Sequence, residues 1–243
     1  MFFEKIQKLV RIIPNRYFLK TLLRTGVAAS VEHTQVLKNL KKYEFLTIID
    51  IGANRGQFAL IARDFFPKAK IVSFEPLEEA AKTFHRIFSV DPMTLLYENA
   101  LGPIHKNMEI HISKQDDSSS LLPISGLQDD IFPGTEEKET RIVEVKTLDE
   151  VLSDESIEQP ALLKLDVQGF EIDVLKGCES LLHLFEYIYV ECSFVELYVG
   201  QSLAYEVISF LSTNEFALTG IYNLSYSKQG FPIQGDFLFK KKH

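Results

Sequence analysis

Two glycines and a carboxylate follow the apolar run 45–51, in the segment DIGANRG at residues 50–56. Gly52 can turn the backbone tightly and approach a ligand, because it has no Cβ in the way. Gly56 allows the next helix to begin close to a sheet, with its unpaired N–H groups facing a bound group. Asp50 can hold an ammonium group or order the turn. A ligand-free turn is the alternative, since a glycine-rich turn alone is weak evidence.

An acid, Glu75, ends the next apolar run in the segment SFEP at residues 73–76. It lies about 20 residues beyond the glycine turn, the spacing at which a carboxylate accepts hydrogen bonds from a ribose diol. Glu75 also precedes an expected helix, whose dipole favours an acid at that end. The two roles are compatible, and the pairing with Gly52 favours ribose binding.

Lys164 and Asp166 end a third buried run, in the segment KLDVQGFE at residues 164–171. A buried charge without a partner is costly, so we expect Asp166 to pair with Lys164 or with a ligand. Glu171 is expected to be an acid of the first helical turn rather than a catalyst. Glu191 ends the next apolar run and adds a carboxylate to the same edge.

The glycine turn differs from those that bind pyrophosphate. The dinucleotide fingerprint Gly-x-Gly-x-x-Gly has its middle glycine where the pyrophosphate approaches, and Asn54 stands there. The sequence has no Walker phosphate loop. A ligand with a ribose and an amino-acid end but no phosphates remains, and S-adenosylmethionine has that shape. Two alternatives stay open: a nicotinamide-dependent oxidoreductase on a related fold, and a cofactor-binding module without turnover.

Alternating strand and helix patterns from residue 44 onward must position these groups. Continuous β-rich apolar runs are typical of strands buried on both faces. Their alternation with helices predicts right-handed crossovers and a mostly parallel α/β sheet, whose ligands bind beyond the carboxyl ends of the strands. The expected buried strands are 45–51, 70–74, 93–97, 161–165 and 187–191, and the expected helices are 58–66, 77–88, one from 171, and 203–211.

The middle and the end of the chain depart from this rhythm. Residues 108–112 and 141–145 alternate apolar and polar side chains, which predicts two half-exposed strands. The polar stretch 113–139 is expected to form a wall of the ligand site, with its SSSLL segment as part of a lid or as a solvated loop. Residues 216–222 and 236–239 are expected to form an antiparallel pair.

Residues 1–43 are expected to form a helical extension, and residues 44–243 the main domain. Helices are expected up to Pro14, over about 17–25 and over about 30–40. The first 24 residues carry six basic residues against one acid. This basic face could make weak contact with an anionic membrane surface or an acidic partner. The simpler interpretation, which we favour, is a helical cover whose charges face water.

The composition excludes several classes of protein. The chain has 243 residues, 46% of them apolar and 25% charged, with a net charge of −8, which excludes collagen, disorder and a disulfide scaffold. The acidic balance argues against nucleic-acid binding, which depends on clustered Lys and Arg. Charges interrupt the apolar stretch at the N-terminus, so neither a secretory signal nor a membrane span is predicted. A cytoplasmic protein with reduced Cys178 and Cys192 is the expectation.

Six segments occur together in one order: DIGANRG, SFEP, YENALG, SSSLL, TLDEVL and LLKLDVQGFEIDVLKG. From about residue 47 to the C-terminus, the chain resembles the FkbM family of S-adenosylmethionine-dependent methyltransferases. The resemblance implies a class I methyltransferase fold, with a Rossmann-like seven-stranded sheet that is mostly parallel and has its last strand antiparallel. It also implies methyl transfer to a hydroxyl oxygen of a sugar, a glycan or a natural product.

The resemblance assigns roles to individual residues. Glu75 would take the ribose hydroxyls, and Asn99 and Ala100 would border the adenine. Asp166 would lie beside the sulfonium methyl and the acceptor. The methionine end of the cofactor would be surrounded by Asp50, Gly52, Asn54 and Gly56.

The expected reaction aligns an acceptor hydroxyl with the methyl group while a base removes its proton. Asp166 is the first candidate for positioning the acceptor or accepting its proton, and Glu191 and Lys164 are weaker candidates. The spacing of the acids requires no metal ion, although a divalent ion among Asp166, Glu191 and nearby acids is an alternative. His111 could face the acceptor, whereas His33 is expected to lie outside the core.

Overall fold

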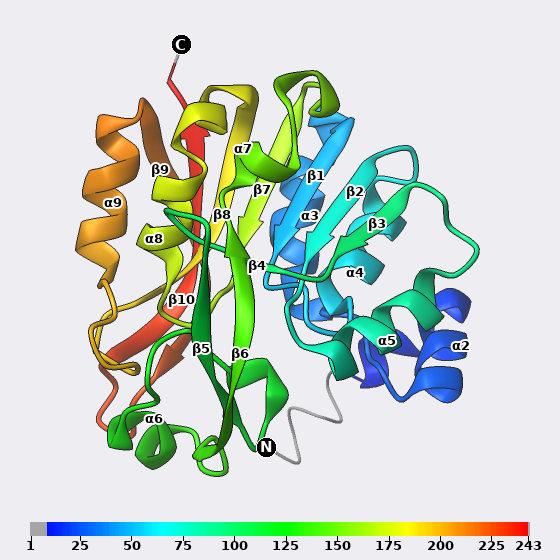
Figure 1. The fold of residues 1–243 in the computed structure, drawn as a ribbon. Helices are drawn as coiled ribbons and strands as arrows, with labels where there is room; N and C mark the ends of the chain where they lie inside the picture. Colours follow the sequence, from blue (N-terminus) through cyan, green and yellow to red (C-terminus); the bar gives the residue numbers. More distant parts are fainter. Residues whose placement is uncertain (1–8, 243) are drawn as a thin grey trace.

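A seven-stranded sheet forms the centre of the computed structural model, which describes residues 9–242 (Figure 1). In spatial order its strands are β3 (Thr94–Tyr97), β2 (Lys70–Phe74), β1 (Thr47–Ile51), β7 (Ala161–Leu165), β8 (Phe185–Ser193), β10 (Pro232–Lys241) and β9 (Phe216–Tyr226). The strands from β3 to β8 pair in parallel, and β10 pairs antiparallel with both β8 and β9. The predicted mostly parallel sheet with an antiparallel last strand is confirmed.

Helices cover both faces of this sheet (Figure 1). One face carries α2 (Arg16–Thr25), α3 (Thr34–Leu40), α4 (Gln57–Phe65) and α5 (Glu78–Phe88), and the other carries α7 (Leu148–Val151), α8 (Glu171–Gly177) and α9 (Ala204–Thr213). Ile48 and Leu162 pack on the first face, whereas their chain neighbours Ile49 and Leu163 pack on the second. Because successive strand residues point to opposite cores, the strands read as unbroken apolar runs.

A separate three-stranded sheet interrupts the strand–helix alternation. It contains β4 (Ala100–Leu101), β6 (Glu137–Lys146) and β5 (Lys106–Ser113), in that order, and β5 pairs antiparallel with β6. The two expected half-exposed strands are therefore confirmed, although both are longer than predicted. Between them lies α6 (Gly126–Ile131), a helix that the polar, turn-rich pattern did not reveal. Its N-cap Ser125 accepts a hydrogen bond from Gln128 N–H.

The N-terminal extension packs into the main core rather than beside it. Ile12, Phe18 and Leu37 belong to the same apolar cluster as Leu162 of the central sheet. The expected helix over 17–25 is confirmed as α2, which ends at Gly26 with φ +75°. The expected helix over 30–40 begins instead with a 3₁₀ turn at Val31–His33. Residues 1–8, in the region of the first expected helix, lie outside the described residues.

The outward face of α2 combines basic and apolar side chains. Arg16, Lys20 and Arg24 recur at helical spacing and surround Leu23, whose surface is 79% exposed. The opposite face buries Phe18 and Thr21. The helix is thus both a cover over the core and a basic surface with an exposed leucine. In the described part of the chain, no helix has the length and apolar character needed to cross a membrane.

Candidate active site

A row of polar side chains crosses the face of the sheet that the N-terminal extension covers. In the strand register Asp50 of β1 lies beside Lys164 of β7, which lies beside Tyr189 of β8. Residues at the same level of neighbouring strands project to the same face, and all three are buried. Two residues further along each strand, the same face carries Asp166 and Glu191. The carboxyl ends of the central strands therefore hold a polar site, as predicted for a parallel sheet.

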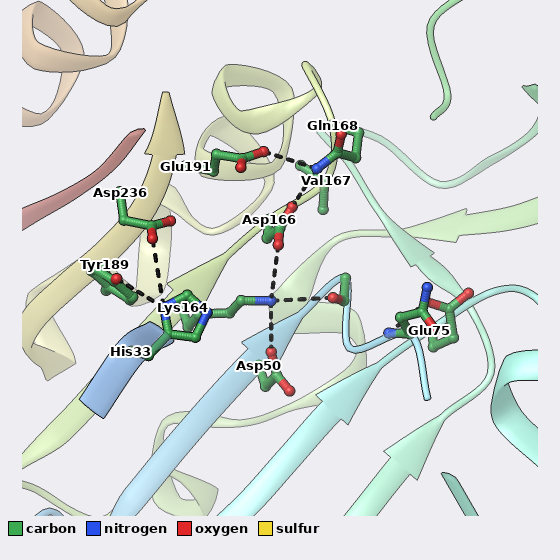
Figure 2. Close-up of polar contacts among 12 residues, drawn as sticks. His33, Asp50, Glu75, Lys164, Asp166, Val167, Gln168, Tyr189, Glu191 and Asp236 are labelled. Carbon is green, nitrogen blue, oxygen red and sulfur yellow. Dashed lines mark hydrogen bonds and ion pairs between the residues drawn. The ribbon is translucent and has the colours of Figure 1, made fainter. Parts of the chain in front are cut away.

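Lys164 is the buried cation of this site (Figure 2). Its Nζ lies 3.0 Å from Asp50 Oδ1 and 3.9 Å from Asp166 Oδ2, and it donates to the Gly52 carbonyl oxygen at 3.2 Å. Burial disfavours its charge, but the carboxylates of Asp50 and Asp166 outweigh that effect and raise the pKa of Lys164. The nearest partner of Lys164 is Asp50, whereas the sequence suggested Asp166. Lys164 is consequently held as an ammonium group.

Asp50 lies beneath the cleft, where it has no exposed surface. Burial raises the pKa of Asp50, and the neighbouring Lys164 ammonium opposes that rise. The carboxylate thus holds an ammonium group, as expected, but the group belongs to the protein. In this arrangement Asp50 orders the turn through Lys164, which also binds the Gly52 carbonyl.

Gly52 adopts φ +76°, and a Cβ built on it would lie 1.8 Å from the Asp166 carbonyl oxygen. The sequence interpretation gave ligand approach as the reason for this glycine, and the structure shows that contact with the end of β7 already requires it. Gly56 adopts φ +88°, and its Cβ would meet Phe84 and Phe88 of α5 at 2.9 and 2.7 Å. The close approach at Gly56 is therefore to another helix rather than to the sheet.

Glu75 joins the end of β2 to the glycine turn. Its Oε2 accepts from Asn54 N–H at 2.9 Å, and its Oε1 accepts from Leu77 N–H, at the start of α5, at 2.8 Å. Burial raises the pKa of Glu75 to about 7, although both backbone hydrogen bonds oppose the rise. The carboxylate also lines the cleft. The Glu75 side chain thus lies both beside the start of a helix and at the cleft, the two positions predicted for it.

The cleft brings together most of the residues that the sequence singled out. Gly52, Asn54, Glu75, Asn99, Ala100, Lys164 and Asp166 all line it. Asp50, Gly56 and Glu191 lie behind its wall. The segment 116–121 contributes Asp116, Asp117, Ser119, Ser120 and Leu121, so the expected wall from the polar stretch is present. His111 is absent from the lining, and its Nδ1 lies 2.7 Å from Glu137 Oε2 on the outer sheet.

Gln168 links three parts of the site and was missed by sequence reasoning. Its Nε2 donates to Asp166 Oδ1 at 2.7 Å and to Glu191 Oε2 at 2.8 Å, and its Oε1 accepts from the Tyr198 hydroxyl at 2.7 Å. Its carbonyl oxygen accepts from Ser120 Oγ at 2.6 Å, which ties the polar wall to the end of β7. One signal could have identified it: a glutamine that follows the strand-end carboxylate Asp166 by two residues, while the adjacent strand ends near a second carboxylate, Glu191.

A half-buried carboxyl group, Glu191, and a buried one, Glu171, support this end of the sheet. Burial, followed by the charges of Asp166 and Asp236, raises the pKa of Glu191 well above its usual range. Glu191 also accepts from Gln234 Nε2 at 3.0 Å. Glu171 begins α8, as expected of a first-turn acid, and its Oε1 accepts from the N–H of Gly169 at 3.0 Å. Burial raises the pKa of Glu171 to about 7.

His33 is half-buried outside the apolar core, but it lines the cleft, a position that the sequence did not predict. The 3₁₀ turn at Val31–His33 places its ring against Phe58 and Tyr189, with centroid distances of 5.4 and 5.6 Å. Its Nδ1 approaches the Tyr189 hydroxyl and the carboxylate of Asp236 (Figure 2). Single-sequence patterns give no sign of this position, because it depends on how the extension packs.

Carboxylates surround this site, but they do not form a cluster suited to a metal. Among residues 9–242 no group of three or more His, Cys, Asp or Glu side chains has the arrangement needed to hold a metal ion.

A family model for the FkbM methyltransferase domain matches residues 50–218. The chain belongs to the FkbM methyltransferase family. The 2-O-methyltransferase NoeI of Sinorhizobium fredii is 30% identical over 199 residues, which cover 79% of this chain and 82% of NoeI. The methyltransferase sdnD of Sordaria araneosa is 28% identical over 61% of this chain and 66% of its own.

Solved structures also resemble this FkbM protein at low identity. The precorrin-6y C5,15-methyltransferase of Geobacter metallireducens is 12% identical, covers 87% of each chain and superposes with a TM-score of 0.49. The FkbM match includes the glycine turn, Glu75 and Asp166, whereas His33 and Asp236 lie outside it.

Proposed function

We propose that this FkbM protein is an S-adenosylmethionine-dependent O-methyltransferase acting on a hydroxyl of a sugar, a glycan or a natural product. Family membership supports methyl transfer, and the 2-O-methyltransferase NoeI supports oxygen as the acceptor atom. The observation that carries the proposal is the bond between Glu75 and Asn54 at the cleft. This bond joins an acid of the type that binds ribose to a turn with Asn54 at the position where the pyrophosphate-binding fingerprint has glycine.

The side chains present fit S-adenosylmethionine. Both oxygens of Glu75 are oriented by backbone N–H groups and retain lone pairs that can accept from a ribose diol. Asn54 occupies φ +45°, a conformation that asparagine tolerates, at the position where dinucleotide-binding turns have glycine. Bound S-adenosylmethionine would supply an electrophilic methyl group on a positively charged sulfur. Asp166 carries the complementary negative charge on the cleft wall.

The nucleoside end of the ligand would lie just beyond the end of β3. Asn99 and Ala100 line the cleft there, and Asn99 Nδ2 donates to the Ala100 carbonyl oxygen at 2.8 Å. We assign these residues to the adenine. Gly52 and Asn54 would border the methionine end, with Asp50 and Gly56 shaping their turn from behind.

Asp166 is the residue we assign to acceptor positioning. Its side chain is 37% exposed in the cleft, Gln168 holds its Oδ1 and Lys164 approaches its Oδ2. These contacts orient the carboxylate and leave lone pairs for an acceptor hydroxyl. We assign Glu191 and Lys164 to positioning Asp166. Glu191 accepts from the same Gln168 amide as Asp166, and Lys164, which pairs with Asp50, also approaches Asp166. Alignment of acceptor and methyl group is the main contribution expected from such a site.

Calorimetry with S-adenosylmethionine and with NAD tests the cofactor assignment. We expect binding of S-adenosylmethionine and none of NAD. Tight NAD binding without a response to S-adenosylmethionine would support the oxidoreductase alternative. Release of S-adenosylhomocysteine in the presence of a panel of methyl glycosides and lipid-linked sugars then separates an enzyme from a binding module.

A further inference from the structure

Three polar groups hold His33 on the cleft wall at one of its ring nitrogens. Nδ1 lies 3.0 Å from the Tyr189 hydroxyl oxygen, 3.4 Å from Asn223 Nδ2 and 3.5 Å from Asp236 Oδ2. The ring also packs edge-on against Phe58. Within residues 9–242 the polar neighbours of this ring all lie at Nδ1. Asn223 Nδ2 can only donate, so its 3.4 Å approach is a contact rather than a hydrogen bond when Nδ1 carries a proton, and Nε2 is then the nitrogen available to a group in the cleft.

The hydrogen bonds among these groups favour one tautomer of His33. The Asp236 carboxylate accepts from Asn223 Nδ2 at 2.7 Å and lies 3.5 Å from His33 Nδ1, and Asn223 Nδ2 also donates to the Tyr189 hydroxyl oxygen at 3.5 Å. Because a carboxylate oxygen accepts, a proton on Nδ1 of His33 has two acceptors nearby, the Tyr189 hydroxyl oxygen at 3.0 Å and the Asp236 carboxylate at 3.5 Å. A neutral imidazole protonated at Nδ1 keeps its lone pair on Nε2.

We propose that His33 accepts the proton of the acceptor hydroxyl at Nε2, with Asp236 and Tyr189 as positioning residues. This inference rests on the proposed methyl transfer, and it leaves Asp166 with acceptor positioning alone. The hydroxyl oxygen forms a bond to the methyl carbon while the carbon–sulfur bond breaks and its electron pair stays on sulfur. The hydroxyl proton passes to Nε2, and the imidazolium releases it to water after the ether product leaves.

The charges that face His33 suit this role. The Asp236 carboxylate lies 3.5 Å from Nδ1, on the sheet side of the ring, where a positive charge on His33 would have a counter-charge. Glu32 precedes it on the cleft wall. Lys164 opposes a positive charge, but its own charge is compensated by Asp50.

The proposed pair comes from parts of the chain outside the matched family domain. His33 belongs to the N-terminal extension, and Asp236 belongs to β10, beyond residue 218. The register of β10 against β8 sets Asp236 beside Glu191, two residues beyond Tyr189. The matched domain would thus bind the cofactor, while the two flanking segments supply proton transfer.

Nitrogen NMR on the full chain labelled with ¹⁵N-histidine, in the presence of S-adenosylhomocysteine, tests the tautomer without an acceptor. The His33→Gln variant identifies the His33 signals among the six histidines. At pH 7.5 we expect a neutral ring protonated at Nδ1, and loss of that preference in Asp236→Asn. A ring protonated at Nε2, or one that stays charged from pH 6 to pH 8, would overturn the proposal.

Turnover on the most reactive glycoside of the panel tests the proton transfer itself. We expect His33→Gln to lower kcat by about 10²- to 10⁴-fold, the usual contribution of a general base, with S-adenosylmethionine affinity within twofold of the wild type. The acidic limb of the wild-type pH–kcat profile should disappear in the variant. His105→Gln is the matched control, since His105 lies on the outer sheet beside Glu144.

The outcomes separate this proposal from the methyltransferase assignment. Unchanged kcat in His33→Gln, or an acidic limb that persists in it, overturns the role of His33 alone. Failure of the wild-type protein to bind S-adenosylmethionine overturns the proposed function. If the cofactor binds and no glycoside in the panel reacts, the NMR tautomer decides whether His33 can serve as the base.

Discussion

The Glu75 carboxylate accepts a hydrogen bond from the backbone N–H of Asn54 at 2.9 Å, and this bond joins the end of β2 to the turn after β1. The same turn is bonded to β2 a second time, because the Phe74 carbonyl oxygen accepts from the N–H groups of Gly52 and Ala53. The acid and the turn therefore form one rigid unit at the cleft. A ligand that binds Glu75 meets the turn in a fixed position.

Replacing Glu75 with Ala should weaken S-adenosylmethionine binding by roughly 1.5–3 kcal/mol, the range for hydrogen bonds to a charged group. Isothermal titration calorimetry measures the change. Glu78→Ala is the control, because Glu78 begins α5 three residues after Glu75 and its side chain is 67% exposed. Equal affinity in the wild type and Glu75→Ala would contradict the ribose assignment.

Gly52→Ala should destabilise the fold much more than Gly26→Ala. Both glycines have nearly the same φ, +76° and +75°, so each substitution costs about 1–2 kcal/mol for the left-handed conformation. Only the Cβ at position 52 meets backbone, since nothing lies within 4 Å of the one at position 26. Urea unfolding of both variants isolates the cost of that contact. Similar decreases in the free energy of unfolding of the two variants would show that the backbone at Asp166 moves to accommodate the added Cβ.

Lys164→Met should lower the free energy of unfolding by about 3–5 kcal/mol, because it leaves the buried Asp50 carboxylate without its counter-charge. Asp50→Asn in the same chain should recover much of the loss, since the uncompensated charge is then gone. Urea unfolding of both single variants and the double variant gives the coupling energy. Additive effects would argue against an energetically important Asp50–Lys164 pair.

The stabilisation that protonated Glu171 contributes should decline as the pH rises from 5 to 8, so the free energy of unfolding should fall. The pKa of Glu171 is raised to about 7 in the folded state, so below that pH the folded protein holds a proton that the unfolded chain has released. The stabilisation is present near pH 5 and is lost through pH 7, on the order of 3 kcal/mol. Urea unfolding of Glu171→Gln should show a flatter pH dependence, whereas the exposed Glu179→Gln should follow the wild type. The same slope in both variants would contradict this source of pH dependence.

The outward face of α2 should give weak binding to anionic vesicles. Leu23 is 79% exposed among Arg16, Lys20 and Arg24, the combination that favours an anionic interface. Co-sedimentation with phosphatidylglycerol-containing vesicles should exceed that with phosphatidylcholine alone and fall with added salt. Lys20→Glu should reduce it, and Val90→Glu, at an 89% exposed site elsewhere, should not. Equal sedimentation with both lipids would favour a face that simply meets water.

Local patterns were sufficient to predict the central sheet. Residues 70–74 and 161–165 were placed to the residue, because unbroken apolar runs mark strands buried on both sides. The strand-end rule likewise brought Glu75 and Asp166 to one cleft. Both successes rest on information carried within a few residues.

Contacts between distant segments could not be read in this way. The partner of Lys164 depends on the register between β1 and β7, which one sequence does not specify. The reason for Gly52 is the carbonyl of Asp166, more than a hundred positions later. His33 reaches the cleft because the extension packs against Phe58 and Tyr189. These three errors concern tertiary packing, whereas the missed helix α6 is an error of secondary structure.

The insertion of β10 between β8 and β9 also constrains the order of assembly. During synthesis β9 leaves the ribosome before the strand that will separate it from β8. A nascent chain that stops short of residue 232 lacks Asp236 and has a gap in its sheet. Such a chain contains all the cleft residues that we assign to the cofactor, but it lacks one of the polar groups around His33. The protein should therefore acquire its proton-transfer apparatus only when the final strand has emerged.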